Sequence, residues 1–259
     1  MASETTAAAA HDEHGDHPEF LAHHFDTPAQ QYDAASIGMW IFLAQEILFF
    51  SGLFVAYFIY RSWYPEAFSV GSRMLDWKLG AANTVVLLFS SYTAAQAVSF
   101  AQMGERKKTG NMILITIACA FVFLVVKFFE YKHKFHLHTL PSRLFDQTWS
   151  GLPLDPHVVS ERAAEIAHAW NNSHAKVVTE LASIEPFHLR SFFGIYFIMT
   201  GVHGLHVIIG IGVYAWIFLR NKRGEFSSRF FTPVHMVGLY WHLVDLIWIF
   251  LFPLLYLID

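Results

Sequence analysis

Long apolar stretches alternate with polar segments along this chain. Five stretches are continuous enough to form spans, at residues 36–60, 79–102, 110–131, 191–219 and 234–257. Each suffices for a helix to cross a hydrocarbon layer of about 30 Å, which takes about 20 residues. Because backbone groups in lipid must be hydrogen-bonded within their own segment, these stretches are predicted to be helices. The pattern therefore predicts an all-α polytopic membrane protein with five transmembrane helices.

The loops between the spans predict how the chain is oriented. The short loops GERKKTG (104–110) and RNKRGEFSSR (220–229) carry three and four basic residues. By the positive-inside rule both loops face the cytoplasm. We therefore expect a cytoplasmic N-terminus and a C-terminus on the outer side.

Two polar regions lie outside the spans. Residues 1–34 lack the features of a signal peptide and are predicted to form a cytoplasmic tail. The tail is rich in histidine, as expected for a solvated segment, with divalent metal binding as the alternative; the histidines are His11, His14, His17, His23 and His24. Residues 35–259 form the predicted membrane domain, with an outer-face insert at 132–190.

The insert contains a helix signal of its own. Ser160 is a candidate N-cap and Pro186 a stop signal. Apolar residues between them recur at helical spacing and predict a stripe on one face: Ile166, Trp170, Val177, Leu181 and Ile184. Such a stripe must pack either on this chain's own outer loops or on a partner subunit, so the insert is predicted to be partly helical.

Composition agrees with a membrane protein and excludes several other classes. Of the 259 residues, 54% are hydrophobic and 15% charged, and 26 phenylalanines accompany eight tryptophans. The net charge of −4 and the lack of a basic run longer than three argue against nucleic-acid binding. A single cysteine, Cys119, excludes an internal disulfide and argues against a thiolate metal cluster. The segment HKFHLH (133–138) lacks a visible fourth ligand, so no metal site is predicted.

The first span carries a carboxylate, Glu46, in the stretch WIFLAQEILFF. Ten residues separate it from Ser36, about 15 Å along a helix, which places it near the middle of the membrane. No opposite charge lies nearby in sequence, and the same face carries Phe42, Phe49, Leu53 and Tyr57. Three interpretations stay open: a neutral acid bonded to a neighbouring helix, a proton-exchanging site, or a group beside a lipid headgroup or water chain.

Few other ionisable groups lie within the spans. Lys127 and Glu130 are three residues apart, as in a self-neutralising pair. The fourth span carries His203 and His206, and the fifth carries His235, His242 and Asp245. We expect these histidines to be hydrogen-bonded in the core, with Asp245 or another histidine as partner. Haem ligation is the alternative, but intervals of three and seven residues do not match those of two-haem b-type cytochromes.

Glycines also mark the fourth span. Gly194, Gly201 and Gly212 share one face, opposite His203 and His206. Glycines permit close helix contact, so this face is predicted to pack tightly against a neighbour.

Five stretches, in order, resemble subunit III of the haem-copper oxidases of the cytochrome c oxidase type. They are FLAQEILFFSGLF (42–54), AANTVVLLFSSYT (81–93), FFEY (128–131), TGVHGLHVIIG (200–210) and YWHLVDLIWIFLF (240–252). The resemblance implies an accessory, non-redox subunit of a proton-pumping terminal oxidase in a bacterial cytoplasmic membrane. It implies no catalytic residue, haem or copper in this chain, with the cofactors in partner subunits I and II.

The resemblance also implies roles for individual residues. Subunit III is expected to hold phospholipid in a V-shaped cleft, keep subunit I from inactivating and help proton entry. Glu46 matches the family's carbodiimide-reactive carboxylate, and Arg220 matches a basic residue that meets a lipid phosphate. The other polar residues assigned to a lipid or subunit interface are Asn83, Glu130, His203, His206, His235, His242 and Asp245.

The chain departs from the family pattern in four respects. It has five spans where longer members have seven, Val55 where many relatives have tryptophan, Lys127 where a neutral polar residue is frequent, and the insert. The insert could contact other subunits of a respiratory complex. Two alternative functions remain open: an accessory subunit of a nitric oxide reductase, and a small transporter or proton channel, which the lack of an inverted repeat disfavours.

Overall fold

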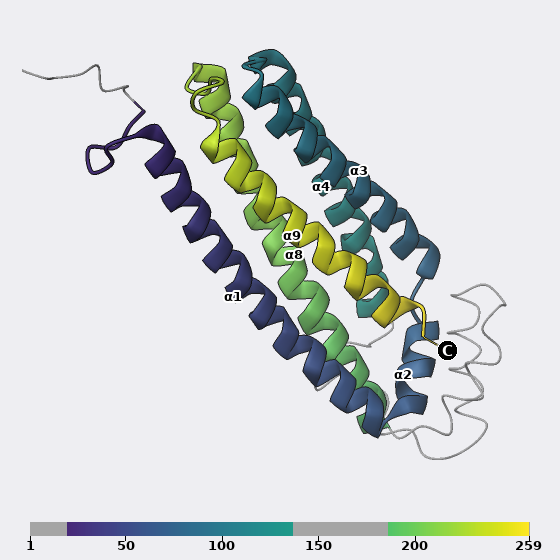
Figure 1. Cartoon of the computed structure of the whole chain (residues 1–259). Coiled ribbons are helices and arrows are strands. Elements are labelled where there is room, and N and C mark those ends of the chain that lie inside the picture. The colour runs from purple at the N-terminus through teal and green to yellow at the C-terminus, as the bar shows by residue number, and fades with distance from the viewer. Residues whose placement is uncertain (1–19, 137–185, 259) are drawn as a thin grey trace, which may run out of the picture.

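The computed structural model describes residues 20–136 and 186–258 and shows a helical bundle (Figure 1). Its helices are α1 (Pro28–Trp63), α2 (Pro65–Arg73), α3 (Trp77–Gln102), α4 (Arg106–His136), α8 (Pro186–Arg223) and α9 (Thr232–Tyr256). All except α2 are long and apolar enough to span a membrane. The predicted all-α architecture with five spans is therefore confirmed.

Local sequence explains where several helices begin and end. The Thr27 hydroxyl caps α1 by accepting a hydrogen bond from the Gln30 amide, and Asp76 caps α3 through the amides of Lys78 and Leu79. Gly104 and Gly224 follow α3 and α8 with φ of 74° and 85°. This left-handed conformation suits glycine and stops each helix in a tight turn.

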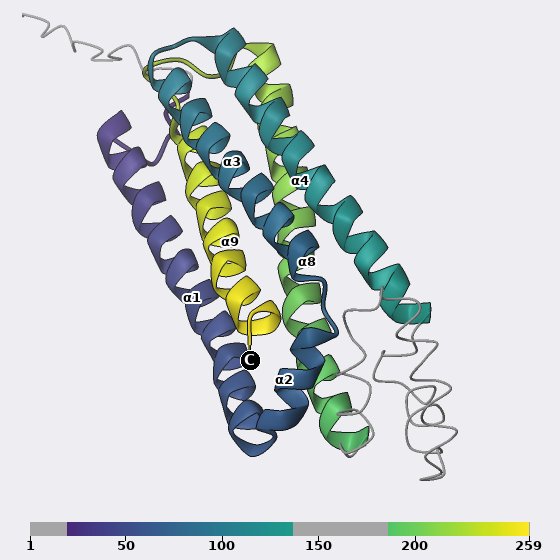
Figure 2. The same cartoon turned by 90° about the vertical axis from the view of Figure 1, so that its right-hand side faces the viewer.

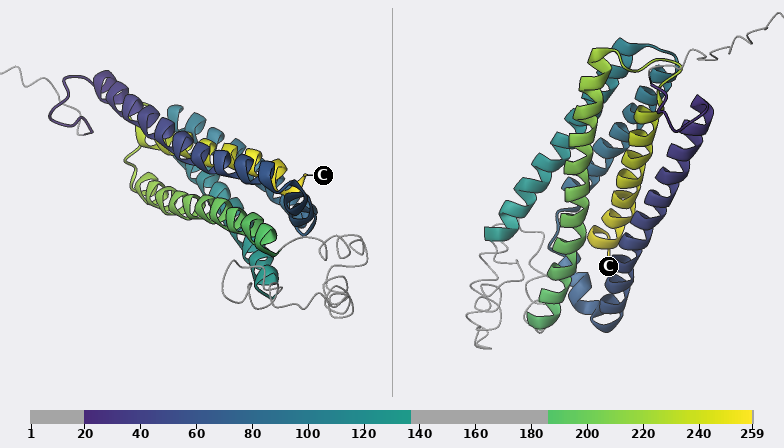
Figure 3. Two further views of the ribbon diagram at one scale, coloured as in Figure 1. Left: turned by 90° about the horizontal axis from the view of Figure 1, so that it is seen from below. Right: turned by 90° about the vertical axis from the view of Figure 1, so that its left-hand side faces the viewer.

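Four helices form a ring and the fifth span lies outside it. α3 packs against α4 and α9, and α8 packs against the same two helices. α1 runs along α8 and α9 on one side, and α2 crosses the end where α1 and α8 meet (Figures 2 and 3). One side of α1 therefore faces away from the bundle, and its exposed large side chains include Trp40, Leu48, Val55 and Trp63.

The two basic loops meet at one end of the bundle. Nε of Arg106 donates to the carbonyl oxygen of Asn221 at 2.8 Å, and Nδ2 of Asn221 donates to the Arg106 carbonyl at 2.9 Å. This end lies opposite α2 and the C-terminal end of α9 (Figure 1). The geometry agrees with the prediction that both loops face the same side, while the identity of that side remains a prediction.

Several boundaries differ from those expected from hydropathy. α1 begins at Pro28, inside the predicted tail, because Thr27 and Pro28 form a capped start upstream of the apolar run. α4 continues to His136, and α8 starts at Pro186. The short helix α2 was not predicted. The predicted insert helix and its stripe lie outside the described residues, as do His11, His14 and His17 of the tail.

The glycine face predicted on α8 makes no close contact with the described residues of this chain. A Cβ added at Gly194, Gly201 or Gly212 would meet no described atom within 4 Å. The close contact occurs at Gly210, where an added Cβ would lie 2.5 Å from the Trp241 ring. α8 therefore packs through the face that also carries His203, and the other glycines point away from the described bundle.

Candidate functional site

Glu46 lies against a histidine from another helix. Its Oε2 is 3.0 Å from Nε2 of His206, which joins the middle of α1 to the middle of α8. The two residues are 160 positions apart in sequence. Glu46 therefore has a polar partner that is distant in sequence. We call this contact the Glu46–His206 pair.

The other ring nitrogen of His206 fixes how protons are arranged in the pair. Nδ1 lies 2.8 Å from the carbonyl oxygen of Val202. Because a carbonyl only accepts, Nδ1 must carry a hydrogen. The contact between Nε2 and Oε2 then requires one further proton, held either by the carboxyl group or by the imidazole. The pair therefore shares a single proton and has no net charge in either arrangement.

Aromatic side chains surround the pair without sealing it. The rings of Phe49 and Phe50 lie 6.4 and 5.3 Å from the imidazole, measured between centroids. The Tyr240 hydroxyl donates to the His206 carbonyl at 2.9 Å. The side chains of Glu46 and His206 remain 12% and 15% exposed, so the pair is accessible from the side of the bundle.

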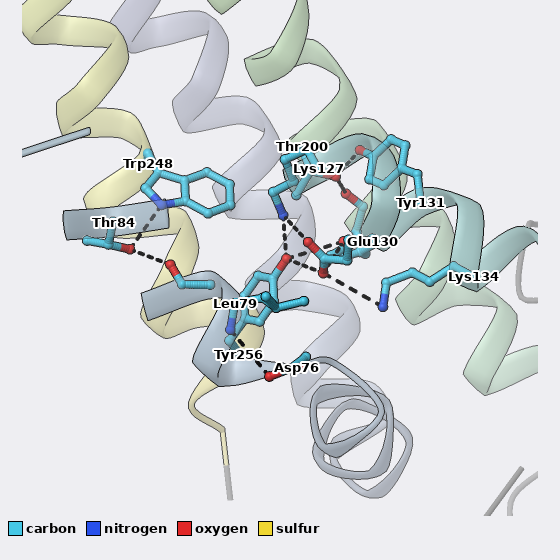
Figure 4. A network of polar contacts seen from close by, with 12 residues as sticks. Asp76, Leu79, Thr84, Lys127, Glu130, Tyr131, Lys134, Thr200, Trp248 and Tyr256 are labelled. Atoms are coloured by element: carbon cyan, nitrogen blue, oxygen red, sulfur yellow. Dashed lines mark hydrogen bonds and ion pairs between the residues drawn. The ribbon is translucent and has the colours of Figure 1, made fainter. Parts of the chain in front are cut away.

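A second ionisable site lies near the α2 end of the bundle (Figure 4). Its members are Lys127, Glu130 and Lys134 of α4, Tyr196 of α8 and Tyr256 of α9; we call them the Glu130 cluster. Glu130 accepts hydrogen bonds from Lys127 at 2.8 Å, Tyr196 at 2.9 Å and Tyr256 at 2.6 Å. The Lys134 ammonium lies 3.8 Å from the same carboxylate.

The Glu130 cluster is buried and tightly connected. The three charged residues are at most 8% exposed. The Lys127 ammonium also lies 4.4 Å from the centre of the Trp248 ring, a favourable position for a cation–π contact. The predicted pairing of Lys127 with Glu130 is confirmed, although it forms part of a larger network across three helices.

Two other predicted histidines bind hydroxyl groups of neighbouring helices. Nδ1 of His235 is 3.2 Å from the Tyr32 hydroxyl, and Nδ1 of His242 is 2.7 Å from the Ser91 hydroxyl. The prediction that Asp245 or another histidine would be the partner is therefore wrong for both. Residues on α1 and α3 reach these rings because the helices pack side by side, which sequence intervals within one helix do not reveal.

Three predicted residues are buried without a hydrogen-bond partner among the described residues. They are Asn83 through Nδ2, His203 through both ring nitrogens and Asp245 through both carboxyl oxygens. His203 contacts the rings of Phe123 and Trp248, at centroid distances of 5.5 and 5.3 Å. The predicted polar residues consequently form several separate contacts rather than one network.

Arg220 lies at the end of α8 that carries the basic loops. Its Nε donates to Oε2 of Glu225 at 2.5 Å. The guanidinium also covers the rings of Trp216 and Phe226, at 4.7 and 5.4 Å from their centres. Part of this guanidinium is therefore already paired within the chain.

Comparison with known proteins identifies the family. The model of the family described as cytochrome c oxidase subunit III matches residues 19–139 and 185–259. The chain belongs to this family. The match omits residues 140–184, which lie within the segment predicted to be an insert.

Three relatives illustrate the range of subunit III. A probable cytochrome c oxidase subunit 3 of Nocardia farcinica is 28% identical over 228 residues, covering 86% of this chain and 87% of the relative. A cytochrome c oxidase subunit 3 of Synechocystis sp. is 28% identical over 98% of this chain and 82% of the relative. A haem-copper oxidase subunit I+III of Aeropyrum pernix is 26% identical over 87% of this chain, which corresponds to 23% of that longer protein.

Sequence reasoning missed several residues of the polar sites in this subunit III. Tyr196, Tyr240 and Tyr256 bond the predicted residues from neighbouring helices, and Lys134 lies four residues after Glu130. The spacing of Lys134 was a usable signal, because residues four apart share a helix face. The tyrosines gave no such signal, since their partners are at least 34 residues away.

No metal-binding group is evident in the described part of subunit III. Among residues 20–136 and 186–258, no three His, Cys, Asp or Glu side chains are arranged to hold a metal ion. The ring nitrogens of His206 are both used in hydrogen bonds, and His235 and His242 each use one. At the Glu46–His206 pair, a carboxyl group and an imidazole are in contact, and both are groups that bind protons.

Proposed function

We propose that this chain is an accessory, non-redox subunit of a proton-pumping haem-copper terminal oxidase. Its roles are to stabilise subunit I, to hold phospholipid and to assist proton uptake. Membership of the subunit III family supports the association with an oxidase. The Glu46–His206 pair is the observation that carries the proton-related part of the proposal.

The pair suits proton exchange because its charge does not change when the shared proton moves. Transfer between Oε2 of Glu46 and Nε2 of His206 takes place over a single contact of 3.0 Å. Both arrangements avoid an isolated charge, which is costly at low dielectric. The residual exposure of both side chains gives water or a lipid headgroup access to the pair.

Subunit I is the partner we assign to the membrane surface of the chain. The relative from Aeropyrum pernix is named subunit I+III, and this chain corresponds to 23% of it. A single polypeptide that unites the two subunits supports a close association between their separate forms. We assign haem and copper to subunit I and its companion subunit II, and expect this subunit purified alone to show no haem absorbance. Stoichiometric haem in that preparation would contradict the assignment.

Phospholipid is assigned to the neighbourhood of Arg220 and the exposed face of α1. The two terminal nitrogens of a guanidinium can bind a phosphate while Nε remains paired. Exposed apolar side chains on α1 provide surface for acyl chains or for another subunit. Lipid analysis of the purified oxidase, with and without Arg220→Ala, tests this assignment.

Glu46→Gln in the assembled oxidase is the main test of the function. The amide can still donate to Nε2 of His206, so the contact survives while the exchangeable proton is lost. We expect the initial rate of oxygen reduction to be largely retained and the enzyme to lose activity faster during sustained turnover. Glu105→Gln is the control, because Glu105 directly precedes α4 and pairs with the exposed Lys108 in the first turn of that helix.

Two outcomes would contradict this role. Immediate loss of all activity in a normally assembled Glu46→Gln enzyme would mean that Glu46 belongs to the catalytic machinery. Turnover lifetimes equal to those of wild type and Glu105→Gln would remove the role assigned to the pair. Co-purified subunits identify the complex itself, since oxidase subunits I and II support the proposal and nitric oxide reductase subunits contradict it.

We place the chain in a bacterial cytoplasmic membrane with its two basic loops on the inner side. Lys107→Cys in a Cys119→Ser background provides a label site in one of these loops. A membrane-impermeant thiol reagent should reach it only from the cytoplasmic side. Other respiratory subunits are proposed as partners of the insert, and weaker association after Trp170→Glu would support that contact.

A further inference from the structure

The two basic loops form one surface at their end of the bundle, and we call the residues of both loops, 104–110 and 220–229, the basic surface. They carry seven basic residues against two glutamates, which gives a net charge of +5. The loops touch at two places. Arg106 and Asn221 exchange hydrogen bonds, and a Cβ added at Gly104 would lie 3.8 Å from the Ser228 amide nitrogen.

Part of this positive charge has no acidic partner in the part of the chain that the structure describes. Glu105 and Glu225 are the acidic residues of the basic surface, and both already form ion pairs with lysine or arginine of the same surface. Lys107, Lys222 and Arg229 are exposed, and no described carboxylate pairs with them. The basic surface therefore has charge available for an anionic partner.

The start of the described chain is fixed to the edge of the basic surface. The Phe20 ring stacks on the ring of Phe230, the residue directly after the second basic loop, with 5.0 Å between centroids and 21° between planes. Gln31 holds the same segment, because its Nε2 donates to the Phe20 carbonyl at 3.2 Å and its Oε1 accepts from the Ala22 amide at 2.8 Å. Residues 1–19 are therefore tethered beside the basic surface.

Residues 1–19 match this surface in charge. They contain five acidic residues and no lysine or arginine, so their net charge with neutral histidine is −5. An extended chain covers at most about 3.6 Å per residue, so Asp16 lies within about 14 Å of Phe20. A short tether gives an effective concentration in the millimolar range, which favours contacts that would be weak between separate molecules. The acidic residues are Glu4, Asp12, Glu13, Asp16 and Glu19.

We propose that residues 1–19 dock through their carboxylates on the basic surface, where Lys107, Lys222 and Arg229 receive them. Headgroups of anionic lipids also carry negative charge, but residues 1–19 are held at the surface by the anchor at Phe20 and balance its charge. The docked segment competes with other anions for the basic surface. Because the contacts join exposed charges, they weaken as the salt concentration rises.

Cross-linking of the assembled complex gives the first test. A water-soluble carbodiimide joins a carboxylate directly to a lysine amine when the two groups are in contact. At low salt we expect links from residues 1–19 to Lys107, Lys108 or Lys222, identified by mass spectrometry, and their loss at high salt. An absence of such links at low salt, or links from residues 1–19 to lysines elsewhere only, would overturn the proposal.

Trypsin gives a second readout, because it cuts after lysine and arginine and therefore leaves residues 1–19 intact. The charge-neutralised variant Asp12→Asn, Glu13→Gln, Asp16→Asn and Glu19→Gln removes four of the five negative charges. At low salt we expect trypsin to cut the basic surface about fivefold faster in this variant than in wild type. At high salt the two rates should be equal, because the contacts are then screened in wild type as well.

The anchor at Phe20 has a matched control. Phe20→Ala removes the stack on Phe230 and should raise the cleavage rate at low salt, whereas Phe25→Ala should not, because the Phe25 ring contacts His24 instead. Equal rates in wild type and in the charge-neutralised variant would contradict docking. Protection that survives neutralisation and disappears when phospholipid is removed would contradict it too, and would assign the basic surface to lipid headgroups.

Discussion

The Glu46–His206 pair and the Glu130 cluster place carboxylates within the same bundle under different conditions. Glu130 is bonded from three helices and is buried with two lysines. Glu46 bonds one histidine across one helix interface and keeps measurable exposure. A fully bonded buried network resists the gain or loss of a proton, because each change leaves a partner unpaired. This difference agrees with a structural role for the Glu130 cluster and with the proton-exchanging role that we propose for the pair.

The position of each site within the fold supports this division. The Glu130 cluster ties together α4, α8 and α9, three of the four helices of the ring. The pair connects α8 to α1, the helix outside the ring. Disturbing the cluster should consequently loosen the bundle, whereas disturbing the pair should leave the ring intact and alter function first.

Removing the carboxylate of the cluster is expected to have the largest effect on stability. Glu130→Leu leaves Lys127 and Lys134 buried without their shared anion, and breaking a buried ion pair costs about 3–5 kcal/mol. Denaturant titration of the assembled oxidase, followed by release and unfolding of this subunit, measures the loss. The double variant Lys127→Met with Glu130→Leu should recover part of it, because one uncompensated charge is removed. A single variant as stable as wild type would contradict the structural role of the cluster.

A matched pair of phenol deletions compares the two sites with the same chemical change. Tyr256→Phe removes a hydroxyl that bonds both Glu130 and Lys127, and hydrogen bonds to charged groups contribute about 1.5–3 kcal/mol. Tyr240→Phe removes a bond to the His206 carbonyl, for which about 0.5–1.5 kcal/mol is expected. The same denaturant titration should rank Tyr256→Phe as the more destabilising. Equal losses of stability in the two variants would mean that the hydrogen bonds of the Glu130 cluster are no stronger than the bond to the His206 carbonyl.

A double-mutant cycle on Glu46 and His206 should give a small coupling in stability. Glu46→Gln and His206→Gln preserve polar contact, so a coupling of about 1 kcal/mol is expected between them. The larger effect should appear in turnover lifetime, where each single variant and the double variant lose activity at a similar rate. That pattern indicates a shared proton, because removing either holder removes the function. Additive effects on lifetime would show that the two residues act separately.

The membrane helices were predictable because hydropathy and loop charge are local properties. The apolar runs predicted α1, α3, α4, α8 and α9, and the basic loops at 104–110 and 220–229 indeed meet at one end. The short helix α2 was missed because nine residues with two charges lack a span signal. Glu46 stood out from the sequence as an acid in an apolar run. Its bond to His206 did not, because it depends on how α1 packs against α8.

The histidine partners and the glycine contacts were predicted wrongly or not at all, because they depend on contacts between helices. His235 and His242 find hydroxyls on α1 and α3, so the nearby Asp245 was a wrong choice of partner. Among the glycines of α8, close contact depends on which face meets α9. Gly210 is in close contact because the Trp241 ring of α9 packs against it. The intervals between residues predict which side chains share one face of a helix. Which other helix packs against that face depends on the tertiary structure.

The smallest change in stability is expected for the exposed ion pair between Arg220 and Glu225 at the basic end of the bundle. Glu225 and Arg220 are 33% and 23% exposed, and such pairs contribute about 0–1 kcal/mol. Glu225→Gln should therefore change stability little, yet it removes a negative charge that competes with a phosphate for the Arg220 guanidinium. We expect more anionic phospholipid to co-purify with this variant than with the Glu105→Gln control. A loss of bound phospholipid would instead show that Glu225 positions Arg220 for the lipid. The ion pair between the two residues would then contribute to lipid binding.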